Sequence, residues 1–128
     1  MAESPKVGTV GWMDLTVPDA VAVKDFYAAV TGWEPSPVNM GDYEDFCMAP
    51  SGSGPVAGVC HARGSNASLP PVWLIYITVA DLDVSLAQVE SKGGKIVRPA
   101  TGMGGYGRYA VVQDPAGAIS ALFEPAKA

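Results

Sequence analysis

The same pattern occurs twice in this chain, as Trp12-Met-Asp-Leu-Thr-Val-Pro-Asp19 and as Trp73-Leu-Ile-Tyr-Ile-Thr-Val-Ala-Asp81. Each stretch is an apolar run, typical of a β-strand, that ends in Val-x-Asp. A glycine follows each aspartate thirteen residues later, Gly32 in the first copy and Gly94 in the second. The sequence therefore contains an internal repeat, and the fold is expected to hold two copies of one unit.

A helix is predicted between each aspartate and its glycine. Both segments carry apolar residues at helical spacing, namely Val23, Phe26, Tyr27 and Val30 in the first and Leu82, Leu86 and Val89 in the second. Asp19 and Asp81 stand where an N-cap side chain accepts the free backbone amides of a first helical turn. Gly32 and the Gly93-Gly94 pair stand where a helix ends in a left-handed conformation, which glycine adopts at low cost.

Three short strands are predicted after each helix, at residues 34–38, 43–49 and 55–60 in the first copy and at 95–98, 107–113 and 118–123 in the second. The last two strands of the second copy flank Asp114-Pro-Ala-Gly117, whose residue types favour a type I turn. Each copy is thus a βαβββ module, at residues 7–61 and 72–125, with a polar linker at 62–71. One module alone would expose an apolar sheet face, so residues 1–128 are expected to form a single domain.

Side-chain alternation assigns a face to each strand residue. The aliphatic set of each first strand is expected to pack on the helix, and the opposite set mixes aromatic, hydroxyl and carboxylate groups. Such a mixture suits a concave sheet surface that lines a ligand cleft. In the last strand, Ala121 and Phe123 are placed with the helix. The residues predicted to line the cleft are Trp12, Asp14, Leu74, Tyr76, Thr78, Leu122 and Glu124.

Three polar residues leave two interpretations open. Asp14 is either a cleft residue or a polar residue of an edge strand, since a carboxylate inside an apolar strand must be paired or solvated. Glu124 is either a cleft residue or a solvated strand end. His61, the single histidine, occupies the position in the repeat that corresponds to Glu124, and it is either functional or part of an exposed linker.

Composition limits the classes of partner. A formal charge of −5 argues against binding to a nucleic-acid backbone, which calls for a basic face. The sequence has no apolar run long enough to span a membrane and no visible secretory signal. Cys47 and Cys60 lack CxxC spacing and stand among apolar neighbours, so we interpret them as reduced thiols. These features predict a cytoplasmic protein without a membrane or nucleic-acid partner.

Several short motifs in order resemble the vicinal oxygen chelate superfamily, which includes glyoxalase I, extradiol dioxygenases and bleomycin-resistance binding proteins. The motifs are Val17-Pro-Asp19, Phe26-Tyr27, Gly32-Trp33, Val79-Ala-Asp-Leu-Asp83, Gly93-Gly-Lys-Ile96, Asp114-Pro-Ala-Gly117 and Phe123-Glu-Pro125. The resemblance covers about residues 7–125. It implies an α+β fold in which two paired βαβββ modules form a curved mixed sheet around a cleft, and it favours a homodimer.

The resemblance also implies where a divalent metal would be held, by a residue of the first strand and a glutamate of the last strand in each module. Glu124 matches one such position, and His61 stands at the corresponding position of the first module. The first-strand positions hold Trp12 or Met13 and Leu74 or Ile75, which do not ligate the cations concerned. We therefore expect no metal cofactor, with His61 and Glu124 as the only candidate ligands.

Two functions follow as hypotheses. The first is a small-molecule binding protein of the glyoxalase/bleomycin-resistance type without the metal centre of the family, with aromatic walls and sparse carboxylates for a planar or cationic guest. The alternative is a divalent-metal-dependent lyase or isomerase of the glyoxalase type with an unusual ligand set. Whether the chain is an enzyme stays open, because a fold does not determine a function.

Overall fold

The structure, a computed structural model, describes residues 5–127 and has the α+β class and the two βαβββ modules that the sequence predicts. The first module comprises β1 (Val10–Val17), α1 (Ala20–Thr31), β2 (Glu34–Asn39), β3 (Glu44–Ala49) and β4 (Ala57–His61). The second comprises β5 (Trp73–Thr78), α2 (Leu82–Ser91), β6 (Lys95–Gly102), β7 (Gly107–Gln113) and β8 (Ile119–Pro125). Short 3-10 helices lie at Gly64–Asn66 and Gly104–Tyr106.

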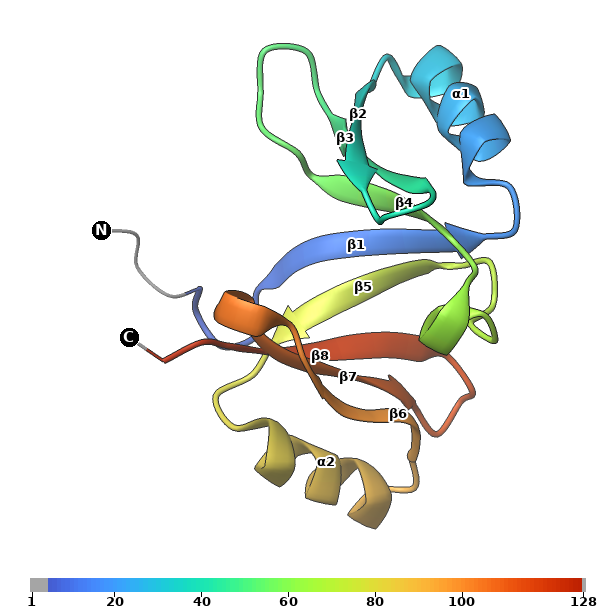
Figure 1. Cartoon of the computed structure of the whole chain (residues 1–128). Helices are drawn as coiled ribbons and strands as arrows, with labels where there is room; N and C mark the ends of the chain where they lie inside the picture. Colours follow the sequence, from blue (N-terminus) through green and yellow to red (C-terminus); the bar gives the residue numbers. More distant parts are fainter. Residues whose placement is uncertain (1–4, 128) are drawn as a thin grey trace. The chain divides into compact units, whose positions relative to one another are not determined.

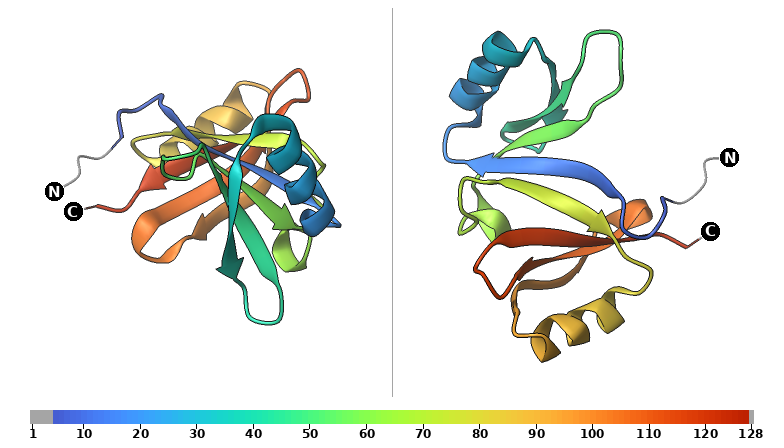
Figure 2. Two further views of the ribbon diagram at one scale, coloured as in Figure 1. Left: turned by 90° about the horizontal axis from the view of Figure 1, so that it is seen from above. Right: turned by 180° about the vertical axis from the view of Figure 1, so that it is seen from behind.

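Each module builds its part of the sheet in the same order. In the first, the strands are ordered β2-β3-β4-β1, with β1 and β4 parallel and the other neighbours antiparallel. In the second, the order β6-β7-β8-β5 repeats this arrangement, with β5 and β8 parallel. One helix packs on each sheet, α1 against β3 and β4 and α2 against β6 and β7 (Figures 1 and 2).

The ends of both helices agree with the predicted caps. The Asp19 carboxylate accepts the backbone N–H of Ala22 at 3.0 Å, and the Asp81 carboxylate accepts that of Val84 at 3.2 Å. Helix α1 ends at Gly32, whose φ of 79° is left-handed. After α2, which is capped by Lys92, the left-handed residue is Gly93, with φ of 87°, the first glycine of the predicted Gly93-Gly94 pair.

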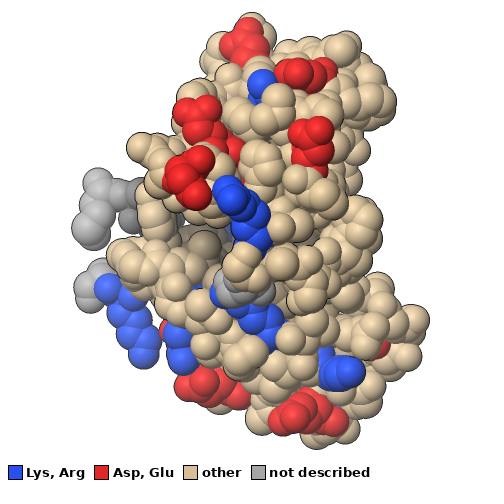
Figure 3. Space-filling model, turned by 45° about the vertical axis from the view of Figure 1, so that its right-hand side comes forward, with Lys and Arg blue, Asp and Glu red and all other residues tan. Residues whose placement is uncertain are grey.

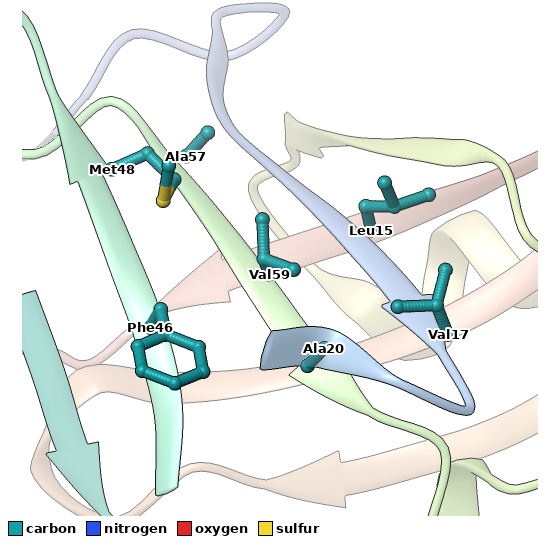
Figure 4. Packing of buried hydrophobic residues seen from close by; sticks show 7 residues of the cluster. All are labelled: Leu15, Val17, Ala20, Phe46, Met48, Ala57 and Val59. Atoms are coloured by element: carbon teal, nitrogen blue, oxygen red, sulfur yellow. The ribbon is translucent and has the colours of Figure 1, made fainter. Parts of the chain in front are cut away.

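A hydrophobic core lies between α1 and the sheet of the first module (Figure 4). Its buried members are Leu15, Val17, Ala20, Phe46, Met48, Ala57 and Val59. Val23 and Tyr27 pack against it from the helix, but Phe26 is 56% exposed and Val30 is 63% exposed. The predicted stripe was therefore partly wrong, because the buried side of α1 is centred on Ala20, Val23 and Tyr27 and leaves the neighbouring side in solvent.

A second core lies between α2 and the sheet of the second module. Leu82, Leu86, Ala110 and Val112 are buried there, and Leu122 packs against them. The predicted faces of β8 were therefore wrong. Leu122 points toward α2, so the alternation of the strand turns its neighbours Ala121 and Phe123 to the opposite face. The more apolar set, Ile119, Ala121 and Phe123, thus faces away from the helix, so the rule that the apolar set of a strand packs on the helix failed for β8.

The segment before β1 is tied to the second module. The backbone N–H of Gly8 donates to the Thr78 carbonyl, and the N–H of Thr78 donates to the Thr9 carbonyl, both at 2.8 Å. Residues 5–11 accordingly group with residues 74–127, and residues 12–73 form the other compact unit. Within residues 5–127, none of the helices has the length and apolar character required to cross a membrane.

Candidate ligand-binding faces

The strand face opposite α1 carries a carboxylate held by an indole. Leu15 and Val17 of β1 belong to the core, so Trp12, Asp14 and Thr16 point to the other side. The Trp12 Nε1–H donates to Asp14 Oδ1 at 2.6 Å. This bond fixes the carboxylate against an aromatic ring.

Asp14 rests on a glycine of the neighbouring strand. Gly58 of β4 is paired with Asp14 in the parallel register, and a Cβ at Gly58 would overlap the Asp14 carboxylate. The same Cβ would also lie 3.6 Å from the Trp12 ring. The missing side chain at Gly58 therefore makes room for the Trp12–Asp14 pair.

Two thiols lie beside this carboxylate. Burial raises the pKa of both Cys47 and Cys60, and the negative charge of Asp14 raises it further. For Cys60 the carboxylate of Asp45 adds to the effect. Both cysteines are free, as predicted, and they stay protonated at neutral pH, so they are poor nucleophiles. We call this surface the carboxylate face, made of Trp12, Asp14, Thr16, Asp45, Cys47, Gly58 and Cys60.

The face of the second module opposite α2 is aromatic and cationic. The rings of Tyr76 and Tyr109 have their centroids 5.9 Å apart, and the Arg98 guanidinium carbon lies 5.3 Å from the Tyr109 centroid. Thr78 and Leu74 of the same face are 3% and 5% exposed. We call this surface the tyrosine face, made of Leu74, Tyr76, Thr78, Arg98, Tyr109, Val111 and Ala121.

Glu124 does not lie on the tyrosine face. Its Oε1 accepts the backbone N–H of Leu82, in the first turn of α2, at 2.8 Å. Arg108 on β7 donates to both carboxylate oxygens at 3.0 and 3.1 Å, and it also contacts Asp83 at 3.1 Å. The bonds from Arg108 and the Leu82 amide lower the pKa of Glu124 to about 2. At neutral pH Glu124 is therefore a charged link between β8, β7 and α2.

The cleft prediction thus needs one correction. Five of its seven residues, Trp12, Asp14, Leu74, Tyr76 and Thr78, lie on a face opposite a helix, where the alternation of β1 and β5 placed them. Leu122 and Glu124 lie on the helix side of β8. Glu124 was predicted to line a solvated cleft, but its carboxylate instead accepts hydrogen bonds from Arg108 and from a helix amide. Their predicted ligand-binding role loses its structural basis.

His61 stands at the end of β4 beside another carboxylate. Asp45 Oδ1 accepts the backbone N–H of His61 at 2.8 Å and lies 3.5 Å from the imidazole Nδ1. The side chain of His61 is only 17% exposed, so it is not the solvated linker residue of the second interpretation. Tyr43 packs its ring edge-to-face on the imidazole, with centroids 5.6 Å apart.

The residues that are present do not fit a metal centre. In the described part of the chain, no group of three or more His, Cys, Asp and Glu side chains is arranged to hold a metal ion. Glu124 is already occupied by Arg108 and a helix amide, and His61 Nδ1 faces Asp45. A catalytic metal site needs about three protein ligands.

The two βαβββ modules can be compared with models of known protein families. The family model of the Glyoxalase/Bleomycin resistance protein/Dioxygenase superfamily matches residues 9–119. The chain belongs to this superfamily. The resemblance inferred from the motifs is thereby confirmed, and it extends over most of both modules.

Curated relatives of the superfamily are longer than this chain. "Putative glyoxylase CFP32" of Mycobacterium tuberculosis is 34% identical over 122 residues, and the match covers 91% of this chain and 46% of the relative. The anthracycline biosynthesis protein DnrV of Streptomyces peucetius is 29% identical over 128 residues, with the same coverage. The chain thus spans about half the length of the curated relatives that it matches.

Solved structures share the fold. Methylmalonyl-CoA epimerase from Mycobacterium tuberculosis superposes with a TM-score of 0.60 at 20% identity, covering 99% of this chain and 94% of the epimerase. A hypothetical protein, BH1468, from Bacillus halodurans superposes with a TM-score of 0.62 at 12% identity, covering 96% and 98%. At these identities the superfamily likeness shows the architecture and leaves the chemistry open.

Sequence reasoning did not single out Asp45, Gly58, Arg98 and Tyr109, which belong to the two faces. Arg98 and Tyr109 belong to strands for which no face had been assigned, and Asp45 follows a loop that obscures its register. Gly58 carried a readable signal, because a glycine inside a strand indicates a close approach of another group. The partner of that close approach is the Asp14 carboxylate, which only the strand register reveals.

Proposed function

We propose that the chain is a small-molecule binding protein of the glyoxalase/bleomycin-resistance type that works without the metal centre of the family. The observation that carries this proposal is the Trp12–Asp14 pair, a carboxylate held by an indole N–H and seated on Gly58. A fixed charge beside an aromatic wall is the kind of anchor that orients a ligand in an otherwise apolar site.

The chemistry of the carboxylate face favours a planar aromatic ligand. An indole ring binds flat aromatic molecules by stacking, and a carboxylate selects for a cationic group on them. Support comes from the relative DnrV, which is named as an anthracycline biosynthesis protein and thus connected with planar polycyclic compounds. On the side of the surface shown in Figure 3, basic and acidic side chains are interspersed among larger uncharged areas. That mixture supports a small-molecule partner over a nucleic acid.

A titration with proflavine tests the proposal. Proflavine is a planar, cationic, tricyclic aromatic compound without a hydroxyl group, and its fluorescence reports binding. Asp14→Asn is expected to weaken binding about tenfold, because it removes a partly buried charge partner. Asp25→Asn is the matched control: Asp25 is exposed on α1 and pairs only with neighbouring Lys24 among the contacts described. No binding of proflavine or of related planar cations, or equal effects of the two variants, would refute the proposal.

A metal-dependent lyase or isomerase is the second candidate, favoured by the relative whose name includes "glyoxylase". Protein purified without chelators distinguishes it from the first. Elemental analysis is expected to find no stoichiometric metal, and added Ni²⁺, Zn²⁺ or Mn²⁺ is expected to leave the melting temperature unchanged. One bound divalent ion per chain, lost in a His61→Ala variant, would instead support the lyase.

The homodimer and the cytoplasmic location belong to the same proposal. Members of the superfamily combine modules within a chain or across a dimer, and free, protonated thiols suit a reducing compartment. Sedimentation equilibrium measures the first and fractionation of the source cells measures the second. The activities of the full-length relatives come to this chain only as proposals, because it spans about half of them.

A further inference from the structure

Two free thiols lie on neighbouring strands of the carboxylate face. Cys47 of β3 is paired with Gly58 of β4, and Cys60 lies two residues further along β4. Their strand neighbours Phe46 and Val59 belong to the core under α1, so both thiols point to the opposite side of the sheet. Both cysteines are free and partly exposed, so they are accessible from solvent.

The strand register suits an ion between the two sulfur atoms better than a disulfide. Cys47 and Cys60 are diagonal neighbours. In an antiparallel pair such residues have Cα atoms about 7–8 Å apart and Cβ atoms somewhat closer. A disulfide needs Cβ atoms about 3.5–4.5 Å apart. Two sulfur atoms that bind one ion in line, each at about 2.3 Å, place their Cβ atoms about 6 Å apart. The register therefore allows both thiols to reach one ion.

The charges around the thiols favour a divalent ion. Burial raises the pKa of the Cys60 thiol most, and nearby negative charges raise it further, those of Asp14, Asp45 and Cys47. The two sulfur atoms therefore lie within electrostatic reach of each other and of a carboxylate. A negative potential attracts a cation and opposes a thiolate without a counter-ion. Two thiolates with a divalent ion form a neutral unit, whereas a monovalent ion would leave a net negative charge beside the carboxylates.

The number of ligands decides among the divalent ions. In the part of the chain that the structure describes, no group of three or more His, Cys, Asp and Glu side chains is arranged to hold an ion. Zn²⁺, which takes four ligands, therefore lacks partners here. A soft ion that binds two thiolates in line, as the mercuric ion does, needs only Cys47 and Cys60.

We propose that Cys47 and Cys60 bind one thiophilic divalent cation of the mercuric type between β3 and β4. Two S–H bonds break, two metal–sulfur bonds form and two protons pass to the solvent, with no change of oxidation state. The site is separate from the metal centre of the family, since neither His61 nor Glu124 takes part. It goes beyond the proposed function and does not depend on it.

The test adds one equivalent of mercuric chloride to the full, reduced chain in the presence of glutathione, a competing single thiol. Native mass spectrometry is expected to show one ion per chain, with a mass gain equal to the ion less two protons. Cys47→Ser and Cys60→Ser each keep one thiol and are expected to hold the ion at least about a hundredfold more weakly, because the second contact is no longer intramolecular. Met40→Leu is the matched control, since it removes an exposed sulfur ligand between β2 and β3 and should leave the affinity unchanged.

A second measurement counts the protons. In weakly buffered solution near pH 7 without glutathione, the natural chain is expected to release two protons per ion and each serine variant one. One proton per ion from the natural chain, an ion that joins two chains, or a serine variant that retains the ion as tightly would overturn the inference. If a serine variant does not fold, as judged by circular dichroism, the proton count and stoichiometry of the natural chain decide. Proflavine binding is measured without mercury, so these outcomes leave the proposed function intact.

Discussion

Substitution of Gly58 by alanine tests whether the carboxylate face is built as the structure shows. The added Cβ would overlap the Asp14 carboxylate, and its other near contact is the Trp12 ring at 3.6 Å. Asp14 must then rotate away, which breaks the 2.6 Å hydrogen bond from Trp12 Nε1. A hydrogen bond to a charged group contributes about 1.5–3 kcal/mol. Alanine in a strand is itself more favourable than glycine by roughly 0.5–1 kcal/mol of folding stability, which offsets part of this loss.

The expected net loss in the free energy of unfolding is therefore about 1–2 kcal/mol. Urea denaturation followed by tryptophan fluorescence measures it, and the slope of the transition is expected to stay unchanged. Gly11→Ala is the matched control, because its Cβ would meet nothing within 4 Å. This control is expected to change stability by less than about 0.5 kcal/mol.

A double-mutant cycle isolates the clash itself. In an Asp14→Ala background the new methyl group at Gly58 meets no carboxylate, so Gly58→Ala is expected to cost nothing there. The two substitutions should thus couple by at least about 1 kcal/mol. Additive effects, or a Gly58→Ala variant as stable as the natural chain, would show that Asp14 does not rest on Gly58 and would remove the structural basis of the carboxylate face.

Three further predictions concern the rest of the fold. A guanidinium partner and a helix amide lower the pKa of Glu124 from 4.5 to about 2, so the stability that its charge contributes is complete above about pH 4.5 and is lost as the pH falls toward 2. The stability of Glu124→Gln, measured by acid unfolding, should not show this loss between about pH 4.5 and 2. Leu82→Ala should lower the free energy of unfolding by about 2–5 kcal/mol in urea, and exposed Val84→Ala by less than about 1 kcal/mol; equal losses would contradict the second core. In the folded protein near pH 8, Cys60 should react with a thiol reagent more slowly than Cys47, and both more slowly than in urea, as single serine variants would reveal.

Much of the fold could be predicted because the same strand and helix-capping signals occur in both copies of the repeat. Asp19 and Asp81 cap their helices as the spacing indicated, and Asp114 accepts the N–H groups of Ala116 and Ala118 in the predicted turn. The faces of β1 could be predicted as well, since one set of its side chains is aliphatic and the other is not. Sequence is sufficient to predict an element when its residues find their hydrogen-bond partners within a few positions along the chain.

The sites were harder to predict because their residues satisfy each other across distant strands. The partners of Glu124, Arg108 and Leu82, lie 16 and 42 positions away along the chain, and no local sequence pattern predicts these contacts. Likewise, Asp45 lies 16 positions from His61, so the histidine could not be distinguished from an exposed linker residue. In β8 the more apolar set, Ile119, Ala121 and Phe123, lies opposite the helix, so the rule that the apolar side packs on the helix gave the wrong faces.

The most direct test of the central claim is to map a bound planar ligand by nuclear magnetic resonance. Backbone and indole signals of the full chain are followed during titration with proflavine. The account predicts that the largest shifts fall on the carboxylate face, at the Trp12 indole and the amides of Asp14 and Thr16, with little change at exposed Phe26 of α1 or Val84 of α2. Shifts concentrated on the helices, with the Trp12 indole unmoved, would contradict it.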